Sequence, residues 1–273
     1  MSSATALRNQ IEHALENRFP AALSPAPRTI HEVAATGIVE ADRLLEGGFP
    51  VGAISEVTGP ESSGRTSIAL AFVAQRTAED RVCAWVDTND AFDPESAAAN
   101  GVNLRQLLWV RCIDPLTRER TGTSERSKAG RSMAGKSMLA TRPWTRLDQA
   151  LRATDLLLQA GGFACIVLDM GDTAPEHGNR IPLATWFRFR QAADRTRCSL
   201  VVLGKAAYAQ SSAAVVLECD PLRAETAGGT VLRGFTFEVR RGRQRFAPGA
   251  MSGRKPPAST WSSAGAWEAE KRA

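Results

Sequence analysis

Apolar and polar residues follow two patterns along this chain, and together these patterns predict alternating strands and helices. Short and almost continuous apolar runs, typical of strands buried on both faces, occupy 53–58, 81–87, 107–113, 163–169 and 199–203. Between these runs, helical patterns occupy 66–77, 94–100, 147–160 and 183–197. Buried strands separated by helices favour a mostly parallel α/β sheet with helices on both faces.

The two ends of the chain depart from this alternation. Residues 5–18 carry apolar side chains at helical spacing, which predicts a short amphipathic helix, and three prolines follow it. Residues 213–219 and 231–239 predict two later strands, which we expect to be antiparallel and at the C-terminal edge of the sheet. The expected divisions are an N-terminal helix and linker over 1–30, a core over 31–245, and a flexible tail over 246–273.

Composition limits the class of protein. A chain of 273 residues, 43% of them hydrophobic, suits one sizeable soluble core. No apolar run approaches the ~20 residues of a membrane span, and the N-terminus lacks the layout of a secretion signal. The five cysteines lie singly, mostly in apolar runs, which favours buried reduced thiols. We therefore expect a cytoplasmic protein with no membrane contact.

The positive charge is concentrated in one segment. Residues 118–142 contain seven lysines and arginines against Glu119 and Glu125, so this segment carries +5, which equals the net charge of the whole chain. Its many serines, threonines and glycines predict an exposed, flexible insertion in the core. Two interpretations stay open, namely a weak contact with DNA or an acidic partner, and a solvated loop with no partner.

A glycine-rich loop follows the strand at 53–58 and precedes the helix at 66–77. Such loops bind phosphate because their backbone N–H groups converge and the helix dipole adds positive potential. The usual pattern is G-x-x-x-x-G-K-[ST], and only Arg65 departs from it. The candidate nucleotide-binding residues of the loop are Gly59, Pro60, Glu61, Ser62, Ser63, Gly64, Arg65, Thr66 and Ser67. Arginine keeps the positive charge but presents a planar fork in place of a compact ammonium, so binding without turnover, genuine hydrolysis and a structural relic all stay open.

The loop residues GPESSG resemble those of bacterial RecA recombinases, and the resemblance extends over roughly 37–245. The stretch 47–70 is similar to the RecA segment that leads into and through its phosphate loop, and WVDTNDAFDP at 85–94 resembles the segment that follows. The resemblance implies a RecA-like core in which Thr66 and Asp169 would hold Mg²⁺ beside ATP.

Several departures from RecA bear on catalysis. The position of its catalytic glutamate falls at Asn89, and an amide has no carboxylate to accept a proton from the attacking water. Asp90 is the candidate substitute, but neighbouring side chains on an extended segment point to opposite sides. The resemblance therefore implies weak or absent use of ATP and Mg²⁺, and no catalytic residue is assigned with confidence.

Further departures bear on DNA and on subunit contacts. The spans that match the DNA-contacting loops of RecA, 171–182 and 204–213, are short, and Lys205 stands near the place of a glutamine that couples nucleotide to DNA there. In the resemblance to RecA, Arg241 and Arg243 fall near the positions of two paired lysines. Through these lysines one RecA subunit touches the nucleotide bound to the next subunit. A contact with a neighbouring subunit or partner and an ordinary basic strand end are both consistent with these arginines.

A RecA-like core with these losses is similar to the ImuA group, the RecA-related accessory proteins of bacterial SOS mutagenesis. The resemblance implies an adaptor in translesion synthesis whose partners are RecA, a Y-family polymerase homologue of the ImuB type, or an error-prone polymerase. Two alternatives stay open. One is a divergent DNA-dependent ATPase or recombinase in DNA repair, and the other is a regulator of RecA filaments.

Overall fold

A computed structural model describes residues 32–112, 145–171, 173–227, 231–244 and 257–264. All of them belong to one compact unit, Glu32–Ala273, which is distinct from Met1–His31. The expected N-terminal helix at 5–18 and the basic insertion at 118–142 lie outside the described residues.

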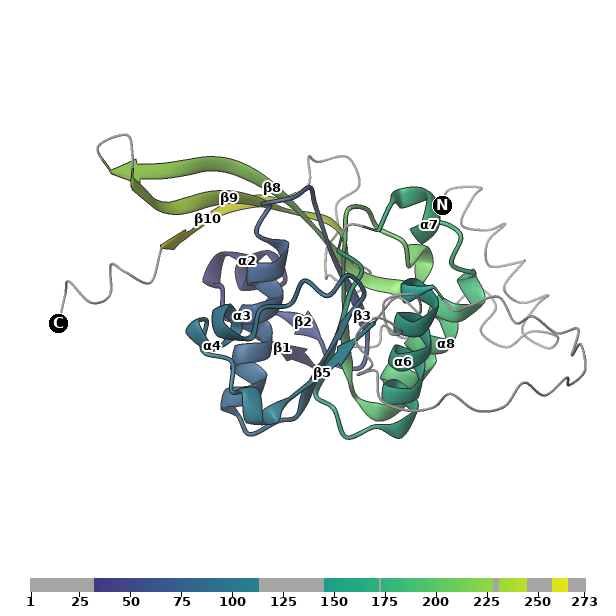
Figure 1. Cartoon of the computed structure of the whole chain (residues 1–273). Coiled ribbons are helices and arrows are strands. Elements are labelled where there is room, and N and C mark those ends of the chain that lie inside the picture. The colour runs from purple at the N-terminus through teal and green to yellow at the C-terminus, as the bar shows by residue number, and fades with distance from the viewer. Residues whose placement is uncertain (1–31, 113–144, 172, 228–230, 245–256, 265–273) are drawn as a thin grey trace, which may run out of the picture. The chain divides into compact units, whose positions relative to one another are not determined.

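An eight-stranded sheet forms the centre of this unit (Figure 1). The strand order is β10-β9-β8-β3-β7-β6-β4-β5, and the six strands from β8 to β5 run parallel. The parallel strands are β3 (Ile54–Thr58), β4 (Cys83–Asp87), β5 (Leu107–Arg111), β6 (Cys165–Asp169), β7 (Ser199–Gly204) and β8 (Ala213–Ala227). Two antiparallel strands, β9 (Val231–Gln244) and β10 (Ala258–Ala264), complete one edge. The predicted fold class is therefore confirmed.

Helices cover both faces of the sheet. One face carries α2 (Val39–Leu44), α3 (Arg65–Ala78) and α4 (Pro94–Ala99), and the other carries α6 (Arg146–Ala160) and α8 (Leu183–Thr196) (Figure 1). The shorter elements are β1 (Val33–Ala34), β2 (Phe49–Pro50), η1 (Leu104–Gln106), α7 (Pro175–Gly178) and η2 (Gln210–Ser212).

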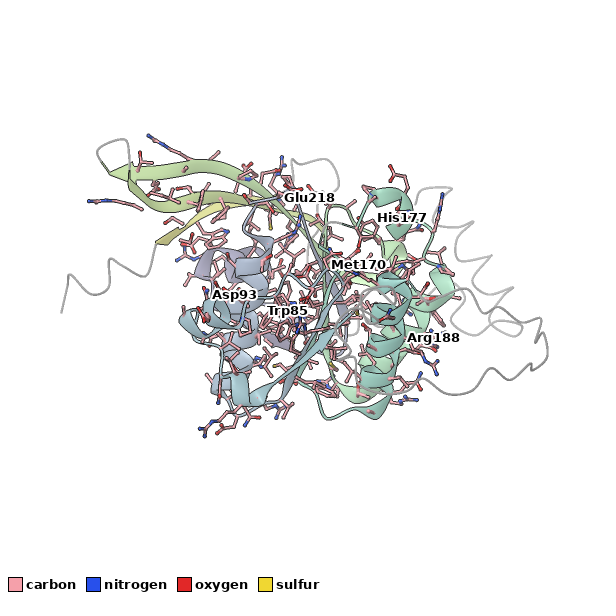
Figure 2. The ribbon with its side chains drawn as sticks, in the orientation of Figure 1. Trp85, Asp93, Met170, His177, Arg188 and Glu218 are labelled. Atoms are coloured by element: carbon pink, nitrogen blue, oxygen red, sulfur yellow. The ribbon has the colours of Figure 1, made fainter. Side chains whose placement is uncertain are left out.

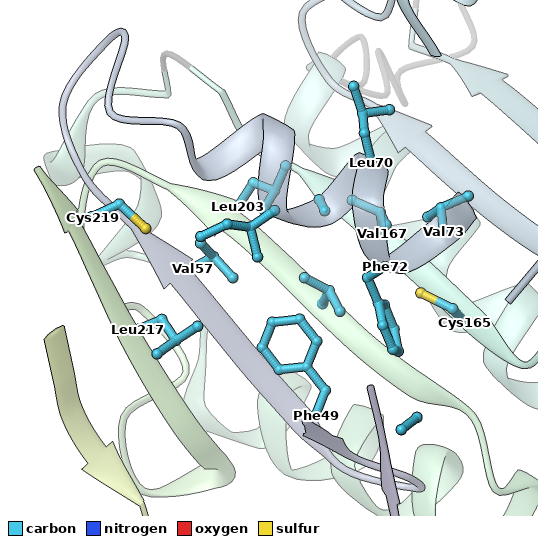
Figure 3. Close-up of a cluster of buried hydrophobic side chains, with 14 of the residues drawn as sticks. Phe49, Val57, Leu70, Phe72, Val73, Cys165, Val167, Leu203, Leu217 and Cys219 are labelled. Carbon is cyan, nitrogen blue, oxygen red and sulfur yellow. The ribbon is translucent and has the colours of Figure 1, made fainter. Parts of the chain in front are cut away.

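Successive strand residues alternate between the two cores. Trp85 on β4 packs in the core beneath α3, whereas Val86 packs in the core beneath α6 and α8. Figure 3 shows the first core, where Phe49, Val57 and Phe72 meet between the sheet and α3. Because both faces of the central strands are buried, the strands read in the sequence as continuous apolar runs.

Local signals set the ends of the helices. The side chain of Thr145 accepts a hydrogen bond from the backbone N–H of Asp148, and the Asp148 carboxylate accepts one from the backbone N–H of Thr145. This capping box starts α6, and Gly161 ends it with a positive φ of 71°, which favours glycine. The predicted helices at 66–77 and 147–160 are both confirmed, with no bound shifted by more than one residue.

The expected flexible tail is wrong for residues 258–264. These residues form β10, which pairs antiparallel with β9 over its whole length. Trp261 turns inward and its ring centroid lies 4.7 Å from that of Phe237, leaving only 9% of its surface exposed. The error has a physical cause: a strand rich in serine and alanine has a weak strand signal of its own and is specified by its pairing with β9.

Candidate nucleotide site

The glycine-rich loop lies between β3 and α3, at the carboxyl end of the parallel strands. Gly64 precedes the first residue of α3 and adopts a left-handed conformation with φ 83°. A Cβ atom at this position would lie 2.9 Å from Trp261 and 3.0 Å from Phe237. The position therefore requires glycine both for its backbone angle and for the close approach of these two rings.

Arg65 turns its guanidinium group back onto the loop. Its Nη1 atom donates to the carbonyl oxygens of Gly59 and of Pro60, the latter at 3.1 Å. Its Nη2 atom donates to the carbonyl oxygen of Gly171 at 3.5 Å, and only 8% of the residue is exposed. The planar fork of arginine suits several carbonyls at once, so this side chain ties the loop to the turn after β6.

Asn89 lies at the place where β4 and β6 end. Its Nδ2 atom donates to the carbonyl oxygen of Met170 at 3.4 Å, and a Cβ atom on Gly171 would lie 2.5 Å from that nitrogen. The amide thus faces the turn after β6 and lines a shared cavity there. The structure therefore places an uncharged amide at this edge of the cavity.

The side chain of Asp90 points away from the cavity and towards Arg111. Its carboxylate accepts hydrogen bonds from Nε and Nη2 of Arg111 at 2.6 Å and 2.7 Å. The hydrogen bond from Arg111 lowers the pKa of Asp90 below its usual value. Asp90 does not line the cavity that holds Asn89, so the two neighbouring side chains diverge as expected. The reason differs from the expected one, because Asp90 has a positive φ of 59° and the segment turns here instead of staying extended.

The turn that carries Asn89 is organised by Asp87, a residue that the sequence analysis did not single out. Its buried carboxylate accepts hydrogen bonds from the backbone N–H groups of Asn89, Ala91 and Phe92 and from the indole N–H of Trp109. An aspartate at the end of an apolar run, followed by a polar turn, is the signal that could have identified it.

A cavity of about 300 Å³ lies beside the loop. Figure 2 labels Trp85 and Asp93, two of the residues that line it. The cavity is lined by residues of α3, β4 and the turn after it, α4, and β6 and the turn after it, namely Arg65, Thr66, Leu70, Trp85, Asn89, Ala91, Phe92, Asp93, Ser96, Asp169 and Gly171. The structure therefore brings together Arg65, Thr66, Asn89 and Asp169, which the sequence predicted as parts of one site.

Asp169 is the buried carboxylate of this cavity. Burial raises the pKa of its carboxyl to about 6, and the charge of Asp87 acts in the same direction. The N–H of Gly171, which donates to Asp169 Oδ1 at 2.9 Å, and the charge of Arg65 oppose that rise. Within the described ranges, no three His, Cys, Asp or Glu residues gather as a metal cluster. The hydroxyl of Thr66 and this carboxylate are oxygen donors of the kind that Mg²⁺ takes, so this pair fits the ion.

Two contacts connect the loop after β7 to the neighbourhood of the site. Lys205 Nζ lies 3.1 Å from Glu61 Oε1, which joins the start of that loop to the glycine-rich loop. The buried carboxylate of Glu56 on β3 accepts hydrogen bonds from the N–H groups of Tyr208 at 2.6 Å and of Ala209 at 2.8 Å. Glu56 was not identified from the sequence, although an acid inside a buried apolar strand is a usable signal.

Arg241 and Arg243 do not line the cavity. The Nη1 atom of Arg241 donates to the carbonyl oxygen of Leu44 at 2.8 Å and lies 3.0 Å from a carboxylate oxygen of Glu46. Arg241 thus stabilises the carboxyl end of α2, where a cation is favourable. Arg243 stands opposite Val216 in the pairing of β8 with β9.

The remaining expectations concern thiols and membranes. All five cysteines are buried and free, and burial raises the pKa of Cys112 to about 11 and of Cys219 to about 12. In the part of the chain that the structure describes, every helix is too short or too polar to cross a membrane.

Comparisons with known proteins agree with this geometry. Residues 5–116 match the model of the RecA N-terminal domain. RecA of Nostoc sp. is 39% identical over 104 residues, which are 38% of this chain and 29% of that protein. RecA of Allorhizobium ampelinum is 29% identical over 189 residues, which are 64% of this chain and 43% of that protein.

The crystal structure of the RadB recombinase superposes with a TM-score of 0.54 at 19% identity, and the match covers 84% of this chain and 94% of that one. At this identity the superposition shows the fold alone. The N-terminal part of the chain is homologous to RecA, and the chain as a whole has the RecA/RadB-like fold. The matched part spans less than half the length of the curated relatives.

Proposed function

We propose that this protein is a RecA-related adaptor of DNA repair that does not hydrolyse ATP efficiently. The observation that carries the proposal is the pairing of Asn89 with the Met170 carbonyl in the cavity beside Thr66 and Asp169. An amide held in this way presents no carboxylate to orient a water molecule and accept its proton. Asp90, the candidate substitute, is bound by Arg111 outside the cavity.

Arg65 supports the same proposal. Its guanidinium is hydrogen-bonded to carbonyls of the loop and of the turn after β6, where a phosphate-binding lysine would instead reach for the outer phosphates. The positive charge therefore stabilises the folded loop without help from a nucleotide. Weak or absent binding of ATP and Mg²⁺ follows from this arrangement.

Where a nucleotide does bind, Thr66 and Asp169 would hold Mg²⁺, and the backbone from Glu61 to Thr66 would face the phosphates. The ion would offset the charge of the phosphates. The protein would contribute position, because the loop sits at the start of α3, whose dipole favours an anion. In this proposal the nucleotide acts as a ligand that stabilises the site.

The partners that we propose are RecA, a Y-family polymerase homologue of the ImuB type, or an error-prone polymerase. The similarity to the ImuA group and the short connections after β6 and β7, which resemble shortened DNA-contacting loops, support this assignment. A weak DNA contact through residues 118–142 is part of the same proposal.

Co-purification tests the adaptor role. Tagged full-length protein is recovered from cells with and without DNA damage, and its partners are identified by mass spectrometry against a tag-only control. We expect a polymerase, with or without RecA, to be enriched after damage. Recovery of RecA alone would favour a filament regulator, and recovery of neither would contradict the adaptor.

The second candidate is a divergent DNA-dependent ATPase. The specific observation in its favour is that Thr66 and Asp169 still line one cavity, and that the pKa of Asp169 is raised towards the range of a general base. This candidate requires ATP turnover that single-stranded DNA stimulates.

A further inference from the structure

The outer face of α8 combines exposed apolar side chains with arginines. Leu183 and Phe187 stand four residues apart and are 53% and 47% exposed, so they lie one above the other on the same side of the helix. Phe187 is the one aromatic side chain of the described residues that is strongly exposed. Two apolar side chains exposed together on a fixed helix offer apolar surface that a partner can bury.

This face is rigid because the opposite side of α8 is buried. Trp186 and Phe189 are fully buried, and their rings meet edge to face at 5.9 Å. Arg188 Nε lies 3.0 Å from Asp155 Oδ1 on α6, which joins the two helices at the surface. Figure 2 labels Arg188 on this outer side of the molecule.

The charge on the helix is positive. α8 carries three arginines against the single acid Asp194, and because Arg188 is paired with Asp155, Arg190 and Arg195 supply the positive charge. The guanidinium carbon of Arg190 lies 5.3 Å from the ring centroid of Phe187, so an arginine stands directly beside the exposed apolar pair. A partner that matches this surface needs apolar side chains next to carboxylates.

A peptide fits these features better than a nucleic acid. Single-stranded nucleic acids bind aromatic side chains by stacking bases on open ring faces. Here Arg190 covers one face of the Phe187 ring, and Leu183 beside it has no ring at all. Aliphatic contact and paired carboxylates are instead the chemistry of an acidic amphipathic peptide segment.

We propose that the α8 surface, defined as Leu183, Phe187, Arg188, Arg190 and Arg195, docks an acidic peptide segment of a partner protein through one or more leucine or aromatic anchors. The proposal rests on the adaptor function, to which it adds a surface and a partner chemistry. The surface lies across the sheet from α3 and the glycine-rich loop (Figure 1), so docking does not depend on the nucleotide site.

A random twelve-residue peptide library displayed on phage, selected on the immobilised full-length protein, tests this proposal. We expect the enriched peptides to combine aspartate or glutamate with leucine, phenylalanine or tryptophan. A fluorescent synthetic copy of an enriched peptide should bind the wild-type protein and lose at least tenfold in affinity on Phe187→Ala and on Arg190→Glu.

Matched variants elsewhere on the surface serve as controls. Leu222→Ala removes a leucine that is 59% exposed on β8, and Arg105→Glu reverses an exposed charge in η1. Both should change the affinity less than twofold. Because Phe187 is exposed, Phe187→Ala should keep the melting temperature, which separates lost docking from lost folding.

Three outcomes would overturn the proposal. They are a selection that enriches nothing, enriched peptides without acidic residues, and peptide binding that survives both α8 substitutions. Binding of a labelled 25-nucleotide oligothymidine that is lost on Phe187→Ala would assign the surface to nucleic acid instead. Each of these results leaves the adaptor role to be decided separately by co-purification.

Discussion

At the scale of single residues, the contribution of Arg65 to the stability of the glycine-rich loop can be measured. Arg65 donates hydrogen bonds to carbonyls of Gly59 and Pro60 within the loop and to that of Gly171 beyond it. Removing a charged donor leaves these carbonyls without that partner, and such bonds contribute about 2 kcal/mol. We expect Arg65→Ala to lower the free energy of unfolding by about 2 kcal/mol in urea denaturation. Arg105→Ala, an exposed control, should change it by less than about 0.5 kcal/mol, and equal effects would contradict the assigned role.

Asp169 gives a prediction that depends on pH. Its pKa in the folded state is about 6 against a usual 3.8, so the folded state binds the proton more tightly than the unfolded chain does. Stability is therefore lost as pH rises from about 4 to about 6, and the full cost, roughly 3 kcal/mol, applies above that window.

Asp169→Asn removes this cost. We expect the variant to be more stable than the wild-type protein by up to about 3 kcal/mol at pH 7.5 and by much less at pH 4. Thermal unfolding across this range measures the difference, with Asp194→Asn, an exposed aspartate of α8, as the control. A gain that does not shrink as pH falls would contradict the assignment of the raised pKa.

The sequence predicts some members of this site and misses others. The loop, Arg65, Asn89 and Asp169 follow from motif and resemblance, and the structure places them around one cavity. The partners of Arg65 could not be predicted, because they depend on the turn after β6, far away in sequence. Glu56 was missed for a similar reason, because the N–H groups that it binds come from the loop after β7. Asp87 binds N–H groups only two to five residues away, so its place at the end of an apolar run was a usable local signal.

At the scale of elements, β10 carries the clearest prediction. Trp261 on this strand packs against Phe237 and lies over Gly64, so it connects the edge of the sheet to the start of α3. Replacing a buried tryptophan by alanine leaves a cavity and typically costs about 3–5 kcal/mol. We expect Trp261→Ala to lower the free energy of unfolding by about 3 kcal/mol. Leu222→Ala is the exposed control. If Trp261→Ala lowers the free energy of unfolding no more than Leu222→Ala does, β10 does not stabilise the core.

The elements that could be predicted are those with strong local signals. The central strands are continuously apolar, and the long helices have regular spacing, a capping box or a closing glycine. The elements that were missed or shortened have weak local signals and depend on pairing with another strand. Strand β9 extends to Gln244, five residues past its predicted end, because β8 and β10 flank it. The one-turn helix α7 lies in a span that the sequence presents only as a short loop.

At the scale of the whole molecule, the charge distribution leads to a prediction for DNA. The segment 118–142, which lies outside the described residues, holds +5 of a chain whose net charge is also +5. We expect weak binding of a labelled oligothymidine that falls steeply with salt, because each neutralised phosphate releases counterions. A variant of the same length with its seven lysines and arginines replaced by serine should lose most of this affinity and of the salt slope. Unchanged binding would assign the segment to a solvated loop.

The central claim is that the molecule does not hydrolyse ATP efficiently. The most direct test is steady-state ATP turnover with and without single-stranded DNA, measured beside RecA. The account predicts no turnover above background for the wild-type protein or for Arg65→Lys, because Asn89 still lacks a carboxylate. Combining Arg65→Lys with Asn89→Glu supplies both missing groups and should give measurable turnover. Wild-type turnover that DNA stimulates and that Thr66→Ala abolishes would contradict the account.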